Sequence, residues 1–220
     1  AKAVRQTYGN HLSSAFGSML NLGLRENDKW LCAMPLFHIS GLSILLRSVI
    51  YGSAVVLHRH FDPKLANQEI LTEGVTIMSI VSTMLSRMLD DLNEAEYPAS
   101  FYGMLLGGGP APMPLLERTA EKNIRVFQTY GMTETSSQIA TLAPEDALRK
   151  LGSSGKPLFP CEISIWKDGR EADPHEPGEI RVKGPNVTPG YLHDRGKESF
   201  ADGWFHTGDI AQINKKGFVY

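Results

Sequence analysis

Residues 103–135 read GMLLGGGPAPMPLLERTAEKNIRVFQTYGMTET, and this stretch decides the fold class. A short apolar run at Gly103–Leu106 precedes a glycine- and proline-rich turn, an amphipathic segment at Pro112–Lys122 and a second apolar run at Ile124–Phe127. Two short strands joined through a helix are typical of a parallel sheet, because a parallel connection must cross over the sheet. The stretch therefore predicts one strand–helix–strand unit of a parallel sheet.

The same alternation extends toward the N-terminus. It predicts further strands at Trp30–Met34, Ala54–His58 and Val75–Ile80, and helices at about Asn10–Leu24, Gly41–Tyr51, Pro63–Glu73 and Thr83–Leu92. Asp62 followed by Pro63 is a typical helix start, and Gly74 is a typical helix stop. Residues 1–150 are therefore predicted to form an α/β subdomain with a doubly wound, mostly parallel sheet.

Ligands of such sheets bind beyond the carboxyl ends of the strands. The loops that follow Ile80, Leu106 and Phe127 are therefore expected to converge on one crevice.

The pattern changes after about residue 150. Residues 152–160 are rich in Gly, Ser and Pro, which predicts a linker. Short alternating runs separated by turn dipeptides follow, at Cys161–Trp166, Gly178–Lys183 and Ile210–Asn214. They predict a smaller, incomplete antiparallel β subdomain over residues 151–220. Because the sequence starts without a helix cap and ends within a strand pattern, we expect a fragment of a larger N-terminal domain.

Composition and charge exclude several classes of protein. The chain has 220 residues, of which 42% are hydrophobic and 21% charged, as in ordinary soluble proteins. A formal net charge of −2 gives no basic field, so neither nucleic acid nor an anionic membrane is an expected partner. No run approaches the roughly 18 apolar residues of a membrane span, and the cytoplasm is the expected compartment. Cys32 and Cys161 are predicted to be reduced and buried, with a disulfide left open, and a homo-oligomer also stays open.

The strongest chemical signal is Gln128-Thr129-Tyr130-Gly131-Met132-Thr133-Glu134-Thr135, directly after the last strand of the predicted parallel sheet. Tyr130 offers a flat face to a purine, and Gly131 lets a ligand approach the backbone closely. Thr133 offers a hydroxyl to a phosphoryl oxygen, and Glu134 is a hard oxygen ligand of the kind that Mg²⁺ takes beside phosphates. These residues predict a nucleotide site; a surface loop that caps the next helix is the alternative.

Two weaker signals are compatible with a nucleotide. Gly107-Gly108-Gly109-Pro110 follows a predicted strand, and consecutive glycines let a main chain lie flat against a ligand. A strand-to-helix turn without a ligand is the alternative. In Trp204-Phe205-His206-Thr207-Gly208-Asp209, the carboxylate beside a glycine can accept both hydroxyls of a ribose, although Gly-Asp is also common in turns.

Together with Pro35-Leu36-Phe37-His38-Ile39-Ser40-Gly41, these motifs resemble those of the superfamily of acyl-CoA synthetases, firefly luciferase and peptide-synthetase adenylation domains. The resemblance covers the whole chain. It implies an ATP-dependent, AMP-forming acid–thiol ligase that makes an acyl-adenylate and then a thioester, with ATP, Mg²⁺, coenzyme A and a small carboxylic acid as its ligands. It also implies that a small C-terminal domain is absent, so we expect this chain alone to be inactive.

The resemblance assigns roles residue by residue. Ala1-Lys2-Ala3-Val4 is similar to the end of the family's phosphate loop, with alanines in place of the usual Pro and Gly around the lysine. The expected nucleotide-binding residues are Lys2, Gly107, Gly108, Gly109, Pro110, Gln128, Thr129, Tyr130, Gly131, Met132, Thr133 and Asp209. Among them, Thr133 is expected at the α-phosphate and Asp209 at the ribose hydroxyls, while Glu134 is expected to hold Mg²⁺.

His38 stands where the family has an aromatic or histidine gate beside the substrate carboxylate. The expected catalytic residues are therefore His38, Thr133 and Glu134. A core histidine hydrogen-bonded to a backbone carbonyl is the alternative for His38.

Within the superfamily, Met34–Tyr51 with Val55-Val56-Leu57 most resembles the o-succinylbenzoate–CoA ligases of menaquinone biosynthesis. The expected acyl pocket contains His38, Ser40, Arg47, Ser82 and Thr83, whose polar groups suit a compact acid with a keto group and a second carboxylate. A salt-bridged or snorkelling helix residue is the alternative for Arg47. Another carboxylic acid, or an inactive nucleotide-binding relative, is the alternative for the function.

Overall fold

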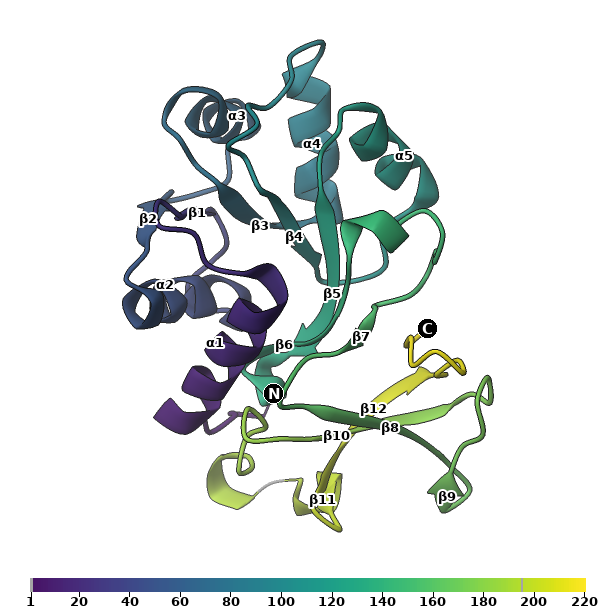
Figure 1. Ribbon diagram of the computed structural model, residues 1–220. Coiled ribbons are helices and arrows are strands. Elements are labelled where there is room, and N and C mark those ends of the chain that lie inside the picture. Colours follow the sequence, from purple (N-terminus) through teal and green to yellow (C-terminus); the bar gives the residue numbers. More distant parts are fainter. Residues whose placement is uncertain (1, 195) are drawn as a thin grey trace. The chain divides into compact units, whose positions relative to one another are not determined.

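The structure is a computed structural model that describes residues 2–194 and 196–220, without the side chain of Asp194 (Figure 1). Ala1, which begins the segment expected to end the phosphate loop, lies outside the described residues. The chain forms two compact units. The parallel-sheet unit comprises Leu24–Tyr130 and Leu142–Gly152, and the antiparallel unit comprises Ala1–Gly23, Gly131–Thr141 and Ser153–Tyr220.

The parallel-sheet unit follows the predicted alternation of strands and helices. Its strands are β1 (Lys29–Cys32), β2 (Ala54–Leu57), β3 (Ile77–Val81), β4 (Gly103–Gly107) and most of β5 (Val126–Met132). Its helices are α2 (Ile39–Tyr51), α3 (Pro63–Thr72), α4 (Ser82–Leu92) and α5 (Met113–Glu121), with a short 3₁₀ turn, η2 (Pro144–Asp146). The five strands pair in parallel in the order β2-β1-β3-β4-β5, which confirms the predicted parallel sheet.

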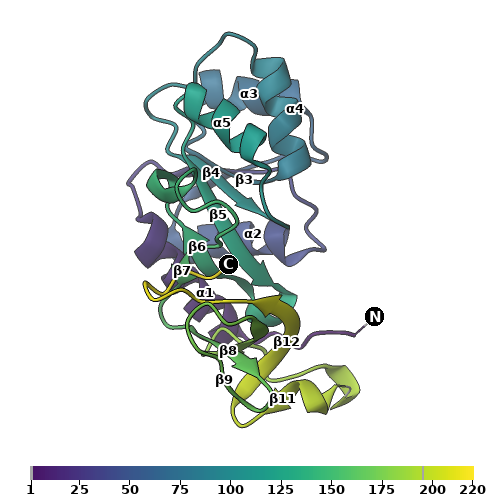
Figure 2. The same ribbon diagram turned by 90° about the vertical axis from the view of Figure 1, so that its right-hand side faces the viewer.

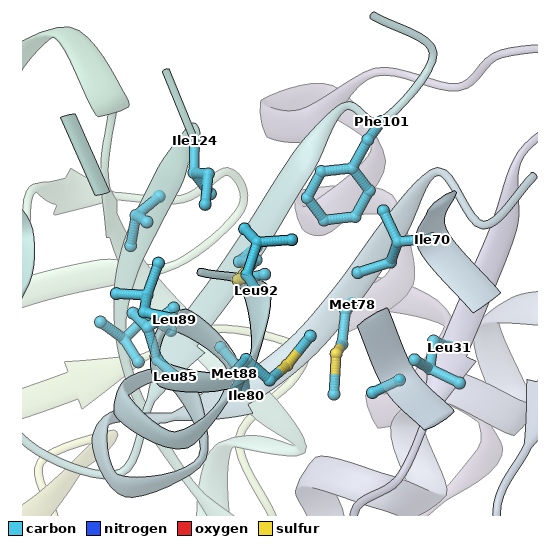
Figure 3. Packing of buried hydrophobic residues seen from close by; sticks show 14 of the residues in the cluster. Leu31, Ile70, Met78, Ile80, Leu85, Met88, Leu89, Leu92, Phe101 and Ile124 are labelled. Carbon is cyan, nitrogen blue, oxygen red and sulfur yellow. The ribbon is translucent and has the colours of Figure 1, made fainter. Parts of the chain in front are cut away.

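Side chains on both faces of this sheet are buried. Leu31, Met78 and Ile80 lie on one face and pack against α3, α4 and α5 in the main hydrophobic core (Figure 3). Figure 2 shows these three helices grouped together over β3 and β4. Trp30 alternates with Leu31 and is buried on the other face, where Arg47 of α2 lies over its indole ring. Burial of both faces explains why these strands are almost continuously apolar.

The helix boundaries follow the expected capping chemistry. The Asp62 carboxylate accepts a hydrogen bond from the Leu65 amide at 2.9 Å, so the predicted start of α3 is confirmed. Gly74 has a φ of 72° just after α3 ends, a conformation that glycine adopts without strain. Within residues 2–194 and 196–220, no helix combines the length and hydropathy needed to traverse a bilayer.

The antiparallel unit contains the second predicted region together with the N-terminal helix. Its helical elements are α1 (Tyr8–Leu22) and the 3₁₀ turns η1 (Thr133–Thr135), η3 (Leu192–Asp194) and η4 (Lys197–Ser199). Its strands are β6 (Ser137–Leu142), β7 (Lys156–Pro157), β8 (Glu162–Lys167), β9 (Arg170–Glu171), β10 (Gly178–Lys183), β11 (Phe200–Ala201) and β12 (Trp204–Ala211). The sheet β11-β12-β10-β8-β9 is antiparallel throughout, which confirms the predicted style of this region.

Helix α1 belongs to the antiparallel unit and is anchored there by a buried polar side chain. Asn10 is buried, and its Nδ2 donates to the carbonyls of Pro185 and Val187 at 2.8 and 2.9 Å. The compact units therefore divide the chain differently from the predicted subdomains, 1–150 and 151–220. Those subdomain boundaries rest on the linear pattern alone and stay a prediction.

Two strands are longer than the sequence predicts. β5 extends through Met132 and includes most of the motif that was expected to be a loop. Thr129 and Tyr130 are β-branched and aromatic, which suits a strand. β12 begins at Trp204 rather than at Ile210, so Gly208-Asp209 lies within a strand and not in a turn.

The first testable prediction concerns the core of the parallel-sheet unit. Leu85 is fully buried in α4, whereas Leu65 in α3 is 42% exposed. Replacing Leu85 by Ala leaves a cavity and should lower the free energy of unfolding by about 2–5 kcal/mol. Leu65→Ala removes the same atoms from a solvated site and should cost much less. Urea unfolding followed by circular dichroism measures both; equal losses would contradict this description of the core.

Candidate active site

The carboxyl ends of β3, β4 and β5 lie side by side in the parallel-sheet unit. Val81 pairs with Gly107, and Leu106 pairs with Gln128. This edge therefore brings together three predicted groups: Ser82 and Thr83 after β3, Gly107–Pro110 after β4, and Gln128–Tyr130 in β5.

The glycine run leaves the main chain at this edge without side chains. Gly108 has a φ of 82°, and a Cβ there would come within 3.1 Å of the Val81 side chain. Gly109 has a φ of 144°, and a Cβ on it would meet no atom within 4 Å. The backbone at Gly109 is thus open on the side where a side chain would stand, so a flat ligand can approach it closely.

The loop between β1 and α2 begins at the same edge, because β1 is parallel to β3 and the loop follows its carboxyl end. His38 immediately precedes α2, and its ring lies 4.6 Å from that of Phe37, centroid to centroid. Its side chain is exposed, so the alternative of a core histidine is wrong. A Cβ at Gly41 would come within 2.5 Å of the Pro35 carbonyl, so the close approach of α2 to this loop requires glycine.

Arg47 is buried in α2, and part of its guanidinium has no hydrogen-bond partner among the described residues. It is 2% exposed, and its Nε and Nη2 atoms have no hydrogen-bond partner among the described residues. The guanidinium lies 5.8 Å from the ring centre of Trp30, and burial lowers the pKa of Arg47. Within residues 2–194 and 196–220 it forms no ion pair, so a salt-bridged or snorkelling arginine is wrong. A buried cation with unpaired donors is costly and is the kind of group that an anionic ligand satisfies.

Ser40 lies in α2, on the same helix as Arg47, whereas Lys2, Gly131, Met132, Thr133, Glu134 and Asp209 belong to the antiparallel unit. Thr133 and Glu134 form the η1 turn, and Gly131 precedes it. A Cβ at Gly131 would collide with the Ser137 carbonyl oxygen, so only glycine allows the chain to fold back so tightly. The Gln6 side chain donates to the Thr133 carbonyl at 2.6 Å and ties the turn to the N-terminal segment.

Glu134 is held at both its main chain and its carboxylate. Its carbonyl accepts the Thr188 amide at 2.7 Å, and Oε1 accepts the Tyr191 hydroxyl at 2.8 Å. Burial, followed by the hydrogen bond to Glu134, raises the pKa of Tyr191, so this hydroxyl stays protonated and donates. Lys2 is exposed, and its Nζ lies 4.8 Å from the centre of the Tyr191 ring.

Asp209 lies beside a bulge in β12. Arg181 pairs with His206 and Glu179 pairs with Ile210, so three residues of β12 oppose one of β10. Gly208 has a φ of 78° at this bulge, and its amide donates to the Glu179 carboxylate at 3.2 Å. Asp209 itself is exposed.

The sequence did not single out the partners of these residues. Gln6, Thr188 and Tyr191 occur in none of the predicted motifs and contact the η1 turn only after folding. A lone Gln, Thr or Tyr at such distances along the chain carries no local signal.

No group of three or more His, Cys, Asp or Glu side chains in the described part of the chain is close enough to hold a metal. Both cysteines are free thiols; Cys32 is buried, and Cys161 is half-buried. Their predicted reduced state agrees with this.

A profile of AMP-binding enzymes matches residues 1–192. The chain belongs to the AMP-binding enzyme family. The profile spans all the predicted nucleotide-binding residues except Asp209.

Several curated relatives of this chain carry the name 2-succinylbenzoate–CoA ligase. The chain is 62% identical to a 2-succinylbenzoate–CoA ligase of Geobacillus sp. (strain WCH70), over the whole chain and 45% of that protein. It is 53% identical to the o-succinylbenzoate coenzyme A synthetase (MenE) of Bacillus subtilis in complex with ATP and magnesium, with a TM-score of 0.96 over 100% of this chain and 46% of that one. The N-terminal domain of FACL13 from Mycobacterium tuberculosis is 30% identical, with a TM-score of 0.94 over the whole chain and 57% of that domain. The chain thus spans a little under half the length of its curated relatives.

The second prediction uses a pair of glycines in the antiparallel unit. Gly131→Ala should destabilise this unit by about 1–3 kcal/mol, because the new methyl group must displace backbone at Ser137. Gly9→Ala lies in α1, where the nearest atom to the new Cβ is 3.6 Å away, and should change stability by less than about 1 kcal/mol. Thermal unfolding of both variants tests this; equal stability would show that residues 131–137 relax freely.

Proposed function

We propose that this chain is the nucleotide-binding part of a ligase that activates o-succinylbenzoate with ATP and transfers the acyl group to coenzyme A in menaquinone biosynthesis. A substrate carboxylate oxygen attacks the α-phosphorus of ATP, the bond to the β-phosphate breaks, and pyrophosphate leaves. The coenzyme A thiolate then attacks the acyl carbonyl carbon, and AMP leaves. The names of the relatives support this reaction, and so does the Bacillus subtilis synthetase, which was solved with the acyl-adenylate OSB-AMP.

Little acid–base chemistry is needed for this reaction, so positioning and neutralisation of charge at phosphorus carry most of the catalysis. We assign adenine to Gly107–Pro110 and Tyr130, with the rest of Gln128–Met132 around it. Thr133 is assigned to the α-phosphate, and Asp209 to the ribose hydroxyls. Lys2 is assigned to the phosphates, and His38 to the reacting carboxylate.

The Glu134 carboxylate fits the Mg²⁺ that such a reaction uses to neutralise phosphate charge. Its Oε2 atom has no hydrogen-bond partner among the described residues, while Oε1 is fixed by Tyr191. Mg²⁺ typically takes one or two protein carboxylates and completes its shell with phosphate oxygens and water. A single carboxylate in a turn is therefore a suitable protein contribution.

The buried guanidinium of Arg47 is the main argument for which acid is the substrate. Its unpaired Nε and Nη2 atoms are available to donate to an anion, and a carboxylate matches a guanidinium fork in shape and charge. The only carboxylate of a monocarboxylic acid attacks the α-phosphorus, so such an acid has no second carboxylate to bind Arg47. Ser40 on the same helix adds a hydroxyl for a keto group. The best match is a compact keto acid with two carboxylates, as o-succinylbenzoate is.

A pyrophosphate-release assay with a panel of acids tests the reaction and the acid together. The assay uses the protein that carries this chain at the full length of its relatives, with ATP, Mg²⁺ and coenzyme A. We expect release with o-succinylbenzoate and little with fatty, amino or simple aromatic acids. Release with a fatty acid but not with o-succinylbenzoate would overturn the choice of acid, and no release with any acid would overturn the activity.

The third prediction concerns Arg47. Arg47→Met keeps most of the side-chain volume but removes the cation, so the KM for o-succinylbenzoate should rise about 10- to 100-fold. The KM for ATP should stay within about twofold of the parent. Arg149→Met, at an exposed arginine, is the matched control and should change neither constant. Equal increases in both KM values for Arg47→Met would remove the argument for a second carboxylate.

A further inference from the structure

Tyr191 lies between two of the residues assigned to the triphosphate and its metal, Glu134 and Lys2. We propose that Tyr191 is a positioning residue that fixes the Glu134 carboxylate for metal binding through its hydroxyl. The proposal rests on the function proposed above and adds a residue outside every predicted motif.

The geometry at Glu134 leaves one oxygen held and the other available. The Tyr191 hydroxyl donates to Oε1 at 2.8 Å, and no described residue contacts Oε2 by a hydrogen bond. The Thr188 amide fixes the Glu134 carbonyl at 2.7 Å, so the main chain of the turn is also held. With the backbone and one carboxylate oxygen fixed, the direction of Oε2 is set before any ligand arrives.

Tyr191 is itself fixed on several sides. The whole residue is buried, with 5% of its surface exposed. Its main chain forms an antiparallel bridge with Val4, and the next amide, of Leu192, donates to the Ala3 carbonyl at 2.8 Å. Its ring meets Phe200 edge-on at 5.7 Å between centroids. The hydroxyl therefore has little freedom to leave Glu134.

The face of the same ring carries Lys2. Nζ of Lys2 lies 4.8 Å from the ring centre, a typical cation–π distance. Gly196 makes room for this contact, because a Cβ there would come within 2.7 Å of Lys2 Nζ and 3.2 Å of the ring. Tyr191→Phe keeps the ring beneath Lys2 and removes only the hydroxyl bond to Glu134. This substitution therefore separates the two contacts.

The test measures Mn²⁺ binding by electron paramagnetic resonance, in the full-length protein with a non-hydrolysable ATP analogue. A hydrogen-bond partner of a metal ligand typically contributes 10- to 100-fold in affinity, so Tyr191→Phe should weaken Mn²⁺ binding about 10-fold. Affinity for the analogue without metal should stay within about twofold, because Lys2 keeps its contact. Tyr97→Phe is the matched control, since it removes another half-buried tyrosine hydroxyl bond, to Asn67 at 2.6 Å, in the parallel-sheet unit.

Glu134→Gln separates failure of this proposal from failure of the proposed function. If Glu134→Gln weakens Mn²⁺ binding and Tyr191→Phe does not, Tyr191 is not a positioning residue and the metal assignment stands. If neither variant changes Mn²⁺ binding, the assignment of Glu134 to the metal is wrong as well. A loss of Mn²⁺ affinity in Tyr97→Phe equal to that in Tyr191→Phe would also overturn the proposal, because the effect would then be general loss of stability.

Discussion

Parallel pairing of β1, β3, β4 and β5 is the constraint on which the parallel-sheet unit depends. Strands that run in one direction need long crossovers, and the crossover helices cover both faces of the sheet. Leu31 on one face and Trp30 on the other are thereby removed from water. With both faces closed, polar chemistry has access to the sheet only at the strand ends. The glycine run, the loop of His38 and the start of α4 are at that edge for this reason.

The antiparallel unit exposes its polar residues by local irregularities instead. In β12, three residues oppose one of β10, and the excess places Gly208 in a left-handed conformation beside Asp209. Just before η1, Gly131 tolerates no side chain, which lets the chain fold back and present Glu134. Both devices break a regular ladder, and both are stabilised by side chains from elsewhere in the same unit, Glu179 in one case and Tyr191 in the other.

Local patterns in the sequence predicted most of the parallel-sheet unit. Periodicity and turn residues located its strands and helices, because each amphipathic element must bury one defined face. The same reasoning ended β5 too early at Phe127, since the polar letters that follow resemble a loop although Thr129 and Tyr130 suit a strand. The compact units divide the chain differently from the predicted subdomains, because long-range bonds such as those of Asn10 hold α1 in the antiparallel unit. The predicted subdomain boundaries stay a prediction.

The sequence by itself determined the order of the elements and the parallel and antiparallel regions. It also supplied the candidate ligands of the nucleotide and the metal, because motifs depend on neighbours along the chain. The tertiary structure decided what each polar side chain meets. It left the Arg47 guanidinium buried with unpaired donors, and it brought Tyr191 to Glu134 across 57 residues of sequence. Burial and long-range hydrogen bonds arise only when distant segments pack together, so no local pattern encodes them.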